Sequence, residues 1–483
     1  MKIALAQMRV RQGMLERNYQ NMVLFSERAK ALGAELIAFP EMCLTGDKRT
    51  EEDFNGLLYH YKAKIAELSK NLGIIIVYGN NAASAENNIP RYYVNRVGTQ
   101  NNGKTITVFD GGSCIYGKNG EISACSLNPY EEGLLFSDGF TAIGENYGIK
   151  YSGSTLSPIE KKFLAVREAY KSMDEMLGNP KCVFGLSGGI DSVLNMVLCF
   201  LALGKDKILA YNLPTVYNSQ ATKQAAAKVC SNLGISLNTI AIDNILKEFE
   251  LSLCRDCQGD VATDINVSCY VPLTASVPLT LDSVTRENLQ SRIRMAILMA
   301  QTSRENAVLI NNTNKVELAL GYGTLYGDLA GAWCPLGDLL KTEIWEMARF
   351  INEKFGQIIP QELIPDENLR FSENQIYPSA ELKENQIDPM IWGFDDWLLE
   401  QFAEYKGQTP EKILRLHKDG ALKELCAKYN LENANDFTSH CEWFFDKLYT
   451  NAFKRIQSPP VLVLSKYAFA GDCRESQNKY EWT

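Results

Sequence analysis

The order of apolar and polar positions divides the chain into stretches with the period of a strand and stretches with the period of a helix. Apolar runs at residues 3–6, 35–40 and 74–79 predict strands. Residues 15–32 and 61–72 lie between these runs and carry apolar side chains at helical spacing. This alternation predicts an α/β sandwich in the first part of the chain.

The pattern changes at residues 80–146, where Asn, Gly and Ser are frequent and the strand candidates are short. A linker is predicted at 152–155, and a helix is expected to begin near Ser157. Strands then alternate again with helices, which predicts a doubly wound parallel sheet. The predicted strands are 182–186, 208–213, 237–242 and 307–310, and the predicted helices are 193–203, 220–233 and 290–301.

Composition and charge limit the number of domains, the partners and the location that can be expected for the chain. A chain of 483 residues with 46% hydrophobic and 22% charged residues is typical of a globular protein with two or three domains. The formal net charge of -9 makes nucleic acid and anionic membranes unexpected partners. The opening residues predict no secretion signal, and no apolar run has the length of a membrane span. The 13 scattered cysteines are typical of reduced thiols, so a cytoplasmic location is expected.

Cys254 and Cys257 form an isolated CxxC pair. A zinc site needs two further ligands, and the chain has only three histidines. Two loop cysteines are therefore the favoured interpretation over a metal site.

The strongest chemical signal is the segment 185–192, GLSGGIDS, where a predicted strand ends and a helix begins. Two glycines allow a tight turn and leave room for an anion. The free N–H groups of a helix N-terminus attract negative charge, and Ser187 and Ser192 add hydroxyl donors. Asp191 is placed to hold Mg²⁺ against phosphate oxygens. No lysine follows the glycines, so the segment is not a Walker A loop, and it favours binding of a whole pyrophosphate.

This segment resembles the SGGxDS signature of the N-type ATP pyrophosphatases, and later segments resemble those of NAD+ synthetases in particular. These segments keep the family's order, and the resemblance covers the chain from about residue 156 to its end. They are 212–219 (NLPTVYNS), 287–295 (ENLQSRIRM), 314–322 (NKVELALGY), 324–328 (TLYGD), 335–342 (PLGDLLKT), 378–388 (PSAELKENQID) and 453–460 (FKRIQSPP).

The resemblance implies roles for individual residues. Asp191, Glu317 and Lys341 would be catalytic, with Asp191 and Glu317 holding Mg²⁺. The implied ATP-binding residues are Gly185, Leu186, Ser187, Gly188, Gly189, Ile190, Asp191, Ser192, Leu213, Ser219, Asn312 and Lys341. The implied residues for deamido-NAD+ are Asn288, Arg292, Glu317, Tyr322, Gly323, Thr324, Leu325 and Lys454. Asn312 stands where the family usually has an ATP-contacting threonine, so this chain departs from the pattern there. Arg292 and Arg294, or Lys454 and Arg455, could instead be solvated surface charges.

The segment 39–46, FPEMCLTG, resembles part of the nitrilase-like amidase that precedes the synthetase in glutamine-dependent enzymes. Glu41 stands in the position of that amidase's base. The family places its catalytic lysine and cysteine between residues 79 and 93 of this chain, and neither motif is present there. We therefore expect residues 1–150 to be a shortened, non-catalytic nitrilase-like domain and residues 156–483 to be the synthetase domain.

Three functions remain open. The preferred expectation is an NAD+ synthetase that uses free ammonia, or ammonia from a separate amidase subunit. The second is a glutamine-dependent NAD+ synthetase with an atypical nucleophile, Cys114 or Cys43. The third is a catalytically silent nucleotide-binding partner of an active paralogue. The resemblance also implies a homo-oligomer, at least a dimer.

Overall fold

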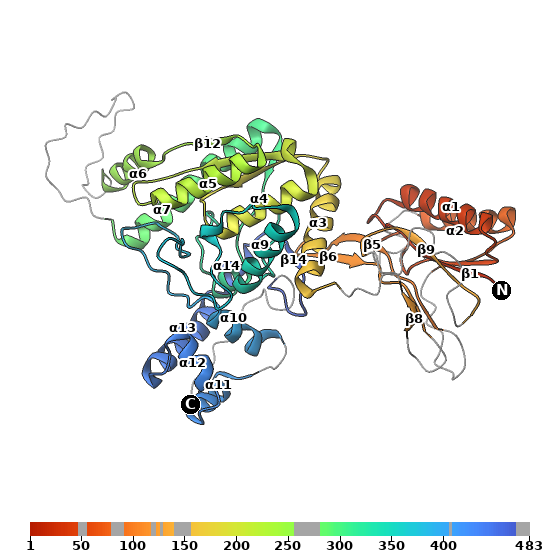
Figure 1. Cartoon of the computed structure of the whole chain (residues 1–483). Coiled ribbons are helices and arrows are strands. Elements are labelled where there is room, and N and C mark those ends of the chain that lie inside the picture. The colour runs from red at the N-terminus through yellow and green to blue at the C-terminus, as the bar shows by residue number, and fades with distance from the viewer. Residues whose placement is uncertain are drawn as a thin grey trace. The chain divides into compact units, whose positions relative to one another are not determined.

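The computed structural model describes residues 1–46, 56–78, 91–116, 122–125, 129–139, 156–255, 281–404 and 408–469. These residues form two compact units, shown in Figure 1. The first contains Met1–Asn179 and the described part of Pro460–Gly471, and the second contains Pro180–Pro459. The helix α3 (Pro158–Met176) belongs to the first unit. The domain bounds expected from the family resemblance, residues 1–150 and 156–483, stay a prediction.

The main sheet of the first unit has the strand order β3-β2-β1-β9. Its strands are β1 (Ile3–Gln7), β2 (Leu36–Ala38), β3 (Ile75–Val77) and β9 (Gly133–Ser137). The first three strands run parallel, as expected for strands joined through helices, whereas β9 runs antiparallel to β1.

The two faces of β1 bury different neighbours because side chains alternate along a strand. Ala4 and Ala6 share a core with side chains from α1 (Leu15–Ala31) and α2 (Leu57–Leu72). Figure 1 shows both helices on the same side of the sheet. On the opposite face, Leu5 packs with Ile115 of a second, smaller sheet. This layering confirms the predicted α/β sandwich.

Two three-stranded sheets complete the first unit. One has the order β4-β7-β8, and the other has the order β14-β6-β5. Their strands are β4 (Arg91–Tyr93), β5 (Val97–Asn101), β6 (Thr105–Asp110), β7 (Cys114–Tyr116), β8 (Ile122–Cys125) and β14 (Val461–Val463). Helix α3 packs against β5 and β6, and its buried Glu168 forms an ion pair with Arg9. A strand from late in the sequence thus completes a sheet of the first unit.

The second unit contains a fully parallel sheet with the order β12-β11-β10-β13. Its strands are β10 (Lys181–Gly185), β11 (Ile208–Asn212), β12 (Leu237–Thr239) and β13 (Ala307–Leu309). The intervening helices are α4 (Ile190–Leu203), α5 (Gln220–Leu233), α6 (Asp243–Arg255) and α7 (Ser283–Glu305). This arrangement confirms the predicted doubly wound parallel sheet. In such sheets, ligands bind beyond the carboxyl ends of the strands.

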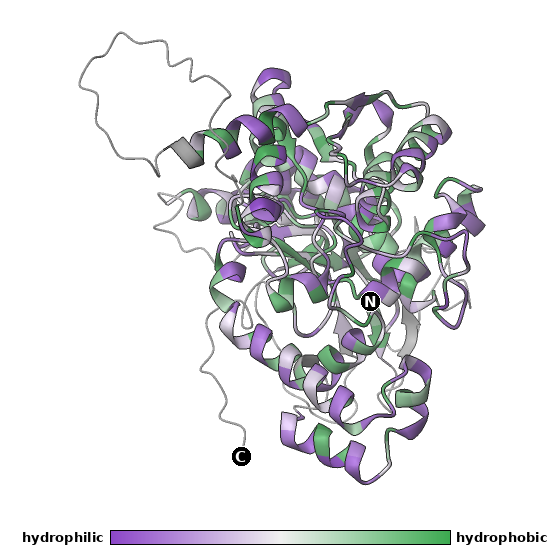
Figure 2. Cartoon of the chain, turned by 90° about the vertical axis from the view of Figure 1, so that its left-hand side faces the viewer, coloured by the Kyte–Doolittle hydropathy of each residue, from purple (hydrophilic) through white to green (hydrophobic). Residues whose placement is uncertain are grey.

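Seven further α-helices follow the last parallel strand in the described part of the second unit. They are α8 (Lys315–Leu320), α9 (Lys341–Phe355), α10 (Phe394–Leu399), α11 (Pro410–Lys418), α12 (Lys423–Tyr429), α13 (Ala434–Thr450) and α14 (Ala452–Ile456). Figure 2 shows hydrophilic and hydrophobic residues alternating along many of the helices. Among the described residues, no helix is long and apolar enough to span a membrane. The side chain of Cys254 and all of Cys257 lie outside the described part of the chain.

Candidate active site

The second unit holds a cavity of about 610 Å³ beyond the carboxyl ends of its parallel strands. Gly185, Asn212 and Ile310, which end or follow β10, β11 and β13, lie on its wall. The volume is in the range of small-molecule sites in proteins. The cavity therefore lies where a doubly wound sheet is expected to bind its ligand.

The turn between β10 and α4 forms one wall of this cavity. Gly188 has a φ of +93°, and a Cβ atom there would lie 2.0 Å from the carbonyl oxygen of Thr222. Only glycine therefore fits this close approach of two backbone segments. Gly189 is the N-cap of α4, and the Ser187 hydroxyl accepts a hydrogen bond from its backbone N–H (3.2 Å). The turn places a helix N-terminus and two serine hydroxyls, from Ser187 and Ser192, at the cavity, which is a favourable arrangement for an anion.

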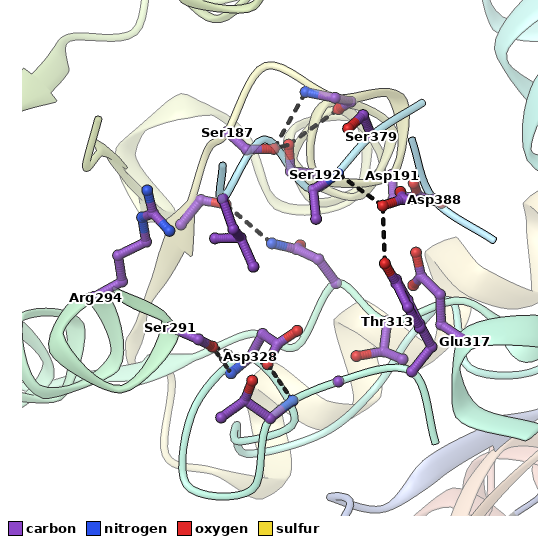
Figure 3. Close-up of a pocket in the computed structure, with 18 of the residues that line it drawn as sticks. Ser187, Asp191, Ser192, Ser291, Arg294, Thr313, Glu317, Asp328, Ser379 and Asp388 are labelled. Carbon is purple, nitrogen blue, oxygen red and sulfur yellow. Dashed lines mark hydrogen bonds between the residues drawn. The ribbon is translucent and has the colours of Figure 1, made fainter. Parts of the chain in front are cut away.

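Asp191, Glu317 and Lys341 meet in the cavity from three separate helices, α4, α8 and α9. Burial, and then the charge of Asp191, raise the pKa of Glu317. The side chain of Lys341 is 1% exposed, and its ammonium forms an ion pair with Asp191. Figure 3 shows Asp191 and Glu317 on the same side of the cavity. This concentration of buried charge is typical of a functional site.

Hydrogen bonds at the start of α8 fix the position of Glu317. Asn314 and Glu317 form a capping box, in which each side chain accepts from the backbone N–H of the other (3.0 Å for both bonds). Asn314 also donates from Nδ2 to Oδ1 of Asp191 (3.2 Å). One helix cap therefore holds Glu317 and is tied directly to Asp191.

Asn312 uses its side chain within the protein. Its Nδ2 donates to the carbonyl oxygen of Gly185 (3.0 Å), and its Oδ1 accepts from Nδ2 of Asn195 (2.9 Å). Asn195 lies on α4 and is fully buried, and it donates as well to the carbonyl oxygen of Asn311 (2.9 Å). The asparagine that departs from the family pattern therefore ties the end of β10 to α4.

A second cluster of polar side chains comes from α7 and from the loop after α8. Ser291 donates to Asp328 (2.9 Å), and the same carboxylate oxygen accepts from the backbone N–H of Thr324 (2.7 Å). Thr324 donates from its hydroxyl to Asn288 (2.7 Å). Arg294 donates to the carbonyl oxygen of Leu213 (2.9 Å), and burial lowers its pKa to about 10. In Figure 3, Arg294 lies across the cavity from Glu317.

The wall near α10 and α14 carries further polar groups. The Tyr322 hydroxyl donates to Asp388 (2.8 Å), and burial, followed by the charge of Asp388, raises the pKa of Tyr322. Lys454 donates to the carbonyl oxygens of Gly321 (3.0 Å) and Gly323 (2.9 Å), and burial lowers its pKa. The cavity thus offers polar groups well beyond the glycine turn, which suits an elongated polar ligand.

Comparison with known proteins agrees with this geometry. The NAD synthase family matches residues 165–426, which is more than half of the chain. The chain belongs to the NAD synthase family. The carbon-nitrogen hydrolase family matches residues 2–81. This match confirms the expected nitrilase-like domain ahead of the synthase domain in this chain.

Three glutamine-dependent NAD+ synthetases are similar to this NAD synthase family chain. That of Synechocystis sp. is 32% identical over 390 residues, which cover 80% of this chain and 60% of the relative. The solved structure from Cytophaga hutchinsonii has a TM-score of 0.68 at 13% identity, with coverage of 100% and 97%. That from Acinetobacter baumannii, in complex with ADP, has a TM-score of 0.61 at 19% identity, with coverage of 99% for both chains. At these identities the two structures support the fold alone. The chain spans less than two thirds of the Synechocystis relative.

These names contradict the preference for ammonia over glutamine. That expectation rested on lysine and cysteine motifs that are missing between residues 79 and 93. A missing motif does not identify the nitrogen donor, because a nucleophile can lie elsewhere in a chain or in an assembly. The relatives' names therefore support the glutamine-dependent alternative better than the ammonia expectation.

Most of the predicted site residues of this NAD synthase family chain line the same cavity. They are Gly185, Leu186, Ser187, Gly189, Ile190, Asp191, Ser192, Leu213, Asn288, Asn312, Glu317, Tyr322, Gly323, Thr324, Lys341 and Lys454. Four others, Gly188, Ser219, Arg292 and Leu325, do not line it. Gly188 packs against the backbone of Thr222, and Ser219 caps α5. Arg292 is exposed and donates to the carbonyl oxygen of Leu325 (3.2 Å). The ligand roles assigned to all of these residues stay predictions.

Sequence reasoning passed over several residues of the cavity wall. Ser291, Arg294, Asp328, Asp388 and Trp392 all line it. The sequence suggests that Arg294 could be a solvated surface charge. Among the arginines of α7, however, it is the one that lines the cavity. The buried positions Ile293, Met295 and Leu298 mark the inner side of the helix and could have identified it.

The amidase-like segment of the first unit contains no comparable cluster among its described residues. Glu41, in the expected base position, is exposed. Cys43 is buried against Met22, with 3.8 Å between the sulfur atoms, and burial raises its pKa to about 12. Cys114 is buried as well. A reactive thiol needs a lowered pKa and access, so Cys43 is an unsuitable nucleophile in this conformation.

Proposed function

We propose that the chain is an NAD+ synthetase that amidates deamido-NAD+ at the expense of ATP. The observation that carries this proposal is one cavity that joins an anion-binding helix N-terminus to the charged group of Asp191, Glu317 and the buried Lys341. Asn288, Tyr322, Thr324 and Lys454 add polar groups to the same cavity beyond the glycine turn, which supports a second polar substrate beside ATP. Membership of the NAD synthase family supports the same reaction.

The glycine turn and the N-terminus of α4 would hold the phosphates of ATP. Asp191 and Glu317 fit a magnesium site, because both carboxylates line the cavity and burial and the nearby charge of Asp191 raise the pKa of Glu317, an effect that a bound cation would oppose. Among the described residues, no group of three metal-binding side chains occurs, so phosphate oxygens and water would complete the six ligands that Mg²⁺ prefers. When bound, Mg²⁺ supplies charge neutralisation at the phosphates. Lys341 would exchange its ion pair with Asp191 for a phosphate oxygen.

The reaction would proceed in two steps. An oxygen of the nicotinate carboxylate attacks the α-phosphorus of ATP, the bond to the β-phosphate oxygen breaks, and pyrophosphate leaves. Ammonia then attacks the acyl carbon of the adenylate, loses a proton, and expels AMP to give NAD+. The protein contributes by holding the two substrates together and by stabilising the developing charge.

Glutamine is the proposed nitrogen donor, supported by the names of the relatives that match most of the chain. Hydrolysis of glutamine within this chain would need an atypical nucleophile. Cys43 and Cys114, the two candidates from the sequence, are both buried, and burial raises the pKa of Cys43 to about 12, so a reactive thiol would need a different conformation of this unit. A separate amidase subunit and a homo-oligomer, at least a dimer, remain predictions.

The decisive assay combines deamido-NAD+, ATP and Mg²⁺ with either glutamine or ammonium and measures NAD+, AMP and pyrophosphate. We expect NAD+ with both donors. Turnover with ammonium alone would contradict glutamine dependence, and labelling with a glutamine-analogue alkylator would locate a nucleophile. Absence of NAD+ and of ATP–pyrophosphate exchange with every donor would contradict the synthetase reaction and favour a silent nucleotide-binding partner.

A further inference from the structure

The Lys341 ammonium lies between a carboxylate and aromatic rings. The Lys341 side chain is 1% exposed, and its ammonium forms an ion pair with Asp191. The ammonium also lies over the ring of Trp392, 4.5 Å from the centroid, and 6.0 Å from the centroid of Trp345. Burying an ammonium is costly, and the electron-rich face of an indole offsets part of that cost. Trp392 lines the active-site cavity, whereas Trp345 does not.

The backbone that carries Trp392 is fixed from several directions. Oδ2 of Asp395 accepts from the backbone N–H of Ile391 (3.1 Å), and Oδ1 of Asp395 pairs with His440 on α13 (2.6 Å). Gly393 follows Trp392 with a φ of +90°, and a Cβ atom there would lie 2.6 Å from the Tyr429 hydroxyl. These contacts hold the backbone on both sides of Trp392, and the residue itself is 5% exposed.

The indole N–H does not explain why tryptophan stands here. Trp392 is 5% exposed, and its Nε1 is buried without a hydrogen-bond partner among the described residues. An unpaired buried donor is unfavourable, and phenylalanine would avoid it. Indole, however, is the aromatic side chain that attracts cations most strongly. The contact that remains to account for tryptophan is its ring face against Lys341.

We propose that Trp392 is a positioning residue that keeps the charged Lys341 side chain aimed at the phosphates of ATP when Asp191 turns to the metal. This inference rests on the proposed function. During that exchange the ammonium loses its carboxylate partner before it gains a phosphate oxygen. The ring face of Trp392 supplies an attraction that does not change during the exchange. Trp392 acts through Lys341 and needs no contact with the reacting atoms.

Fluorinated tryptophans introduced only at position 392 test the proposal. Each added fluorine withdraws electron density from the ring face and weakens its attraction for a cation, while the shape of the ring stays nearly constant. We expect kcat for pyrophosphate release to fall stepwise by about tenfold from tryptophan to the most fluorinated analogue. The affinity for ATP, measured by calorimetry without turnover, should weaken in the same order. The same analogues at Trp397, which stacks on Phe394 and does not line the cavity, should leave both quantities unchanged.

The outcomes separate the explanations. A flat series at position 392 would overturn the proposal and leave Trp392 as a packing residue. A rising series would also overturn it, because fluorination strengthens the indole N–H as a donor and would point to a hydrogen bond with the ligand. W392F should lose less activity than W392L if the ring face matters, whereas equal losses would contradict the proposal. If unsubstituted protein makes no NAD+, the proposed function fails, and the ATP affinity series still decides the role of Trp392.

Discussion

The glycine turn of the second unit and the segment that contains Glu41 in the first unit both follow a strand, yet they end in different surroundings. Asp191 meets Glu317, Lys341 and Asn314 from other helices inside one cavity. Glu41 is exposed, and the nearby Cys43 is part of the hydrophobic core. Motif residues therefore become a site only where other segments bring partners to them. The predictions below test whether this contrast is functional.

The largest expected effect is the loss of adenylation in Glu317→Gln. The substitution keeps the size of the side chain and removes the charge that we assign to the metal. We expect pyrophosphate release to fall by about 10³-fold. Circular dichroism and the unfolding temperature should show an intact fold. Retention of most activity would remove Glu317 from the proposed magnesium site.

The next largest effect is expected at a buried ion pair at the start of α8, the helix that carries Glu317. Lys315, two residues before Glu317, forms a buried ion pair with Asp338 (2.8 Å, with exposed fractions of 1% and 0%). Lys315→Met would leave the carboxylate of Asp338 buried without this partner. We expect the free energy of unfolding, measured in urea, to fall by about 3–5 kcal/mol.

A matched surface pair provides the control for this prediction. Lys228 and Glu362 form an ion pair at 2.9 Å, but Lys228 is 52% exposed. Lys228→Met should change the free energy of unfolding by less than about 1 kcal/mol. Equal effects of the two substitutions would mean that the buried pair has no special part in holding α8.

Gly188→Ala should have an intermediate effect, because the new Cβ atom would collide with the Thr222 carbonyl oxygen at 2.0 Å. We expect a loss of about 3 kcal/mol in unfolding free energy, together with weaker ATP binding. Gly178→Ala is the control, since its φ of +81° is similar but no atom lies within 4 Å of its Cβ position. That substitution should cost only about 1 kcal/mol and leave ATP binding unchanged.

The smallest effect is expected at Cys43. Its pKa of about 12 keeps the thiol protonated at neutral pH, so iodoacetamide should not label it in the folded protein at pH 8. Above pH 9 the unfolded thiol ionises while the folded one keeps its proton, so this group makes the fold less stable as pH rises. Cys43→Ala should leave NAD+ formation from glutamine unchanged. Loss of glutamine use alone would restore Cys43 as an amidase nucleophile.

Local signals account for the parts of the fold and site that the sequence could predict. Apolar periodicity located β10, α4 and β11, since each element buries one face or both. The glycine turn was predictable because its chemistry lies within eight consecutive residues. Ser157 and Pro158 likewise marked the start of α3, where the Ser157 hydroxyl accepts from the backbone N–H of Glu160 (3.2 Å).

Contacts between distant segments account for most of what could not be predicted. Arg292 and Arg294 lie two positions apart on α7, so they point to different sides of the helix, and only the fold shows which side faces the cavity. Trp392 lies outside regular structure, where no periodicity indicates its direction. The segment 461–463 is too short for its pattern to reveal that it pairs with β6.

That pairing has a consequence for how the protein is made. β14 joins β6 in parallel, with Val461 opposite Thr105, so translation must produce the whole second unit before this sheet can close. Until then the nascent chain leaves the ribosome with an open edge on β6, and such edges invite aggregation. A premature stop codon after Lys454 would keep every described residue of the cavity wall and still deprive the first unit of its last strand.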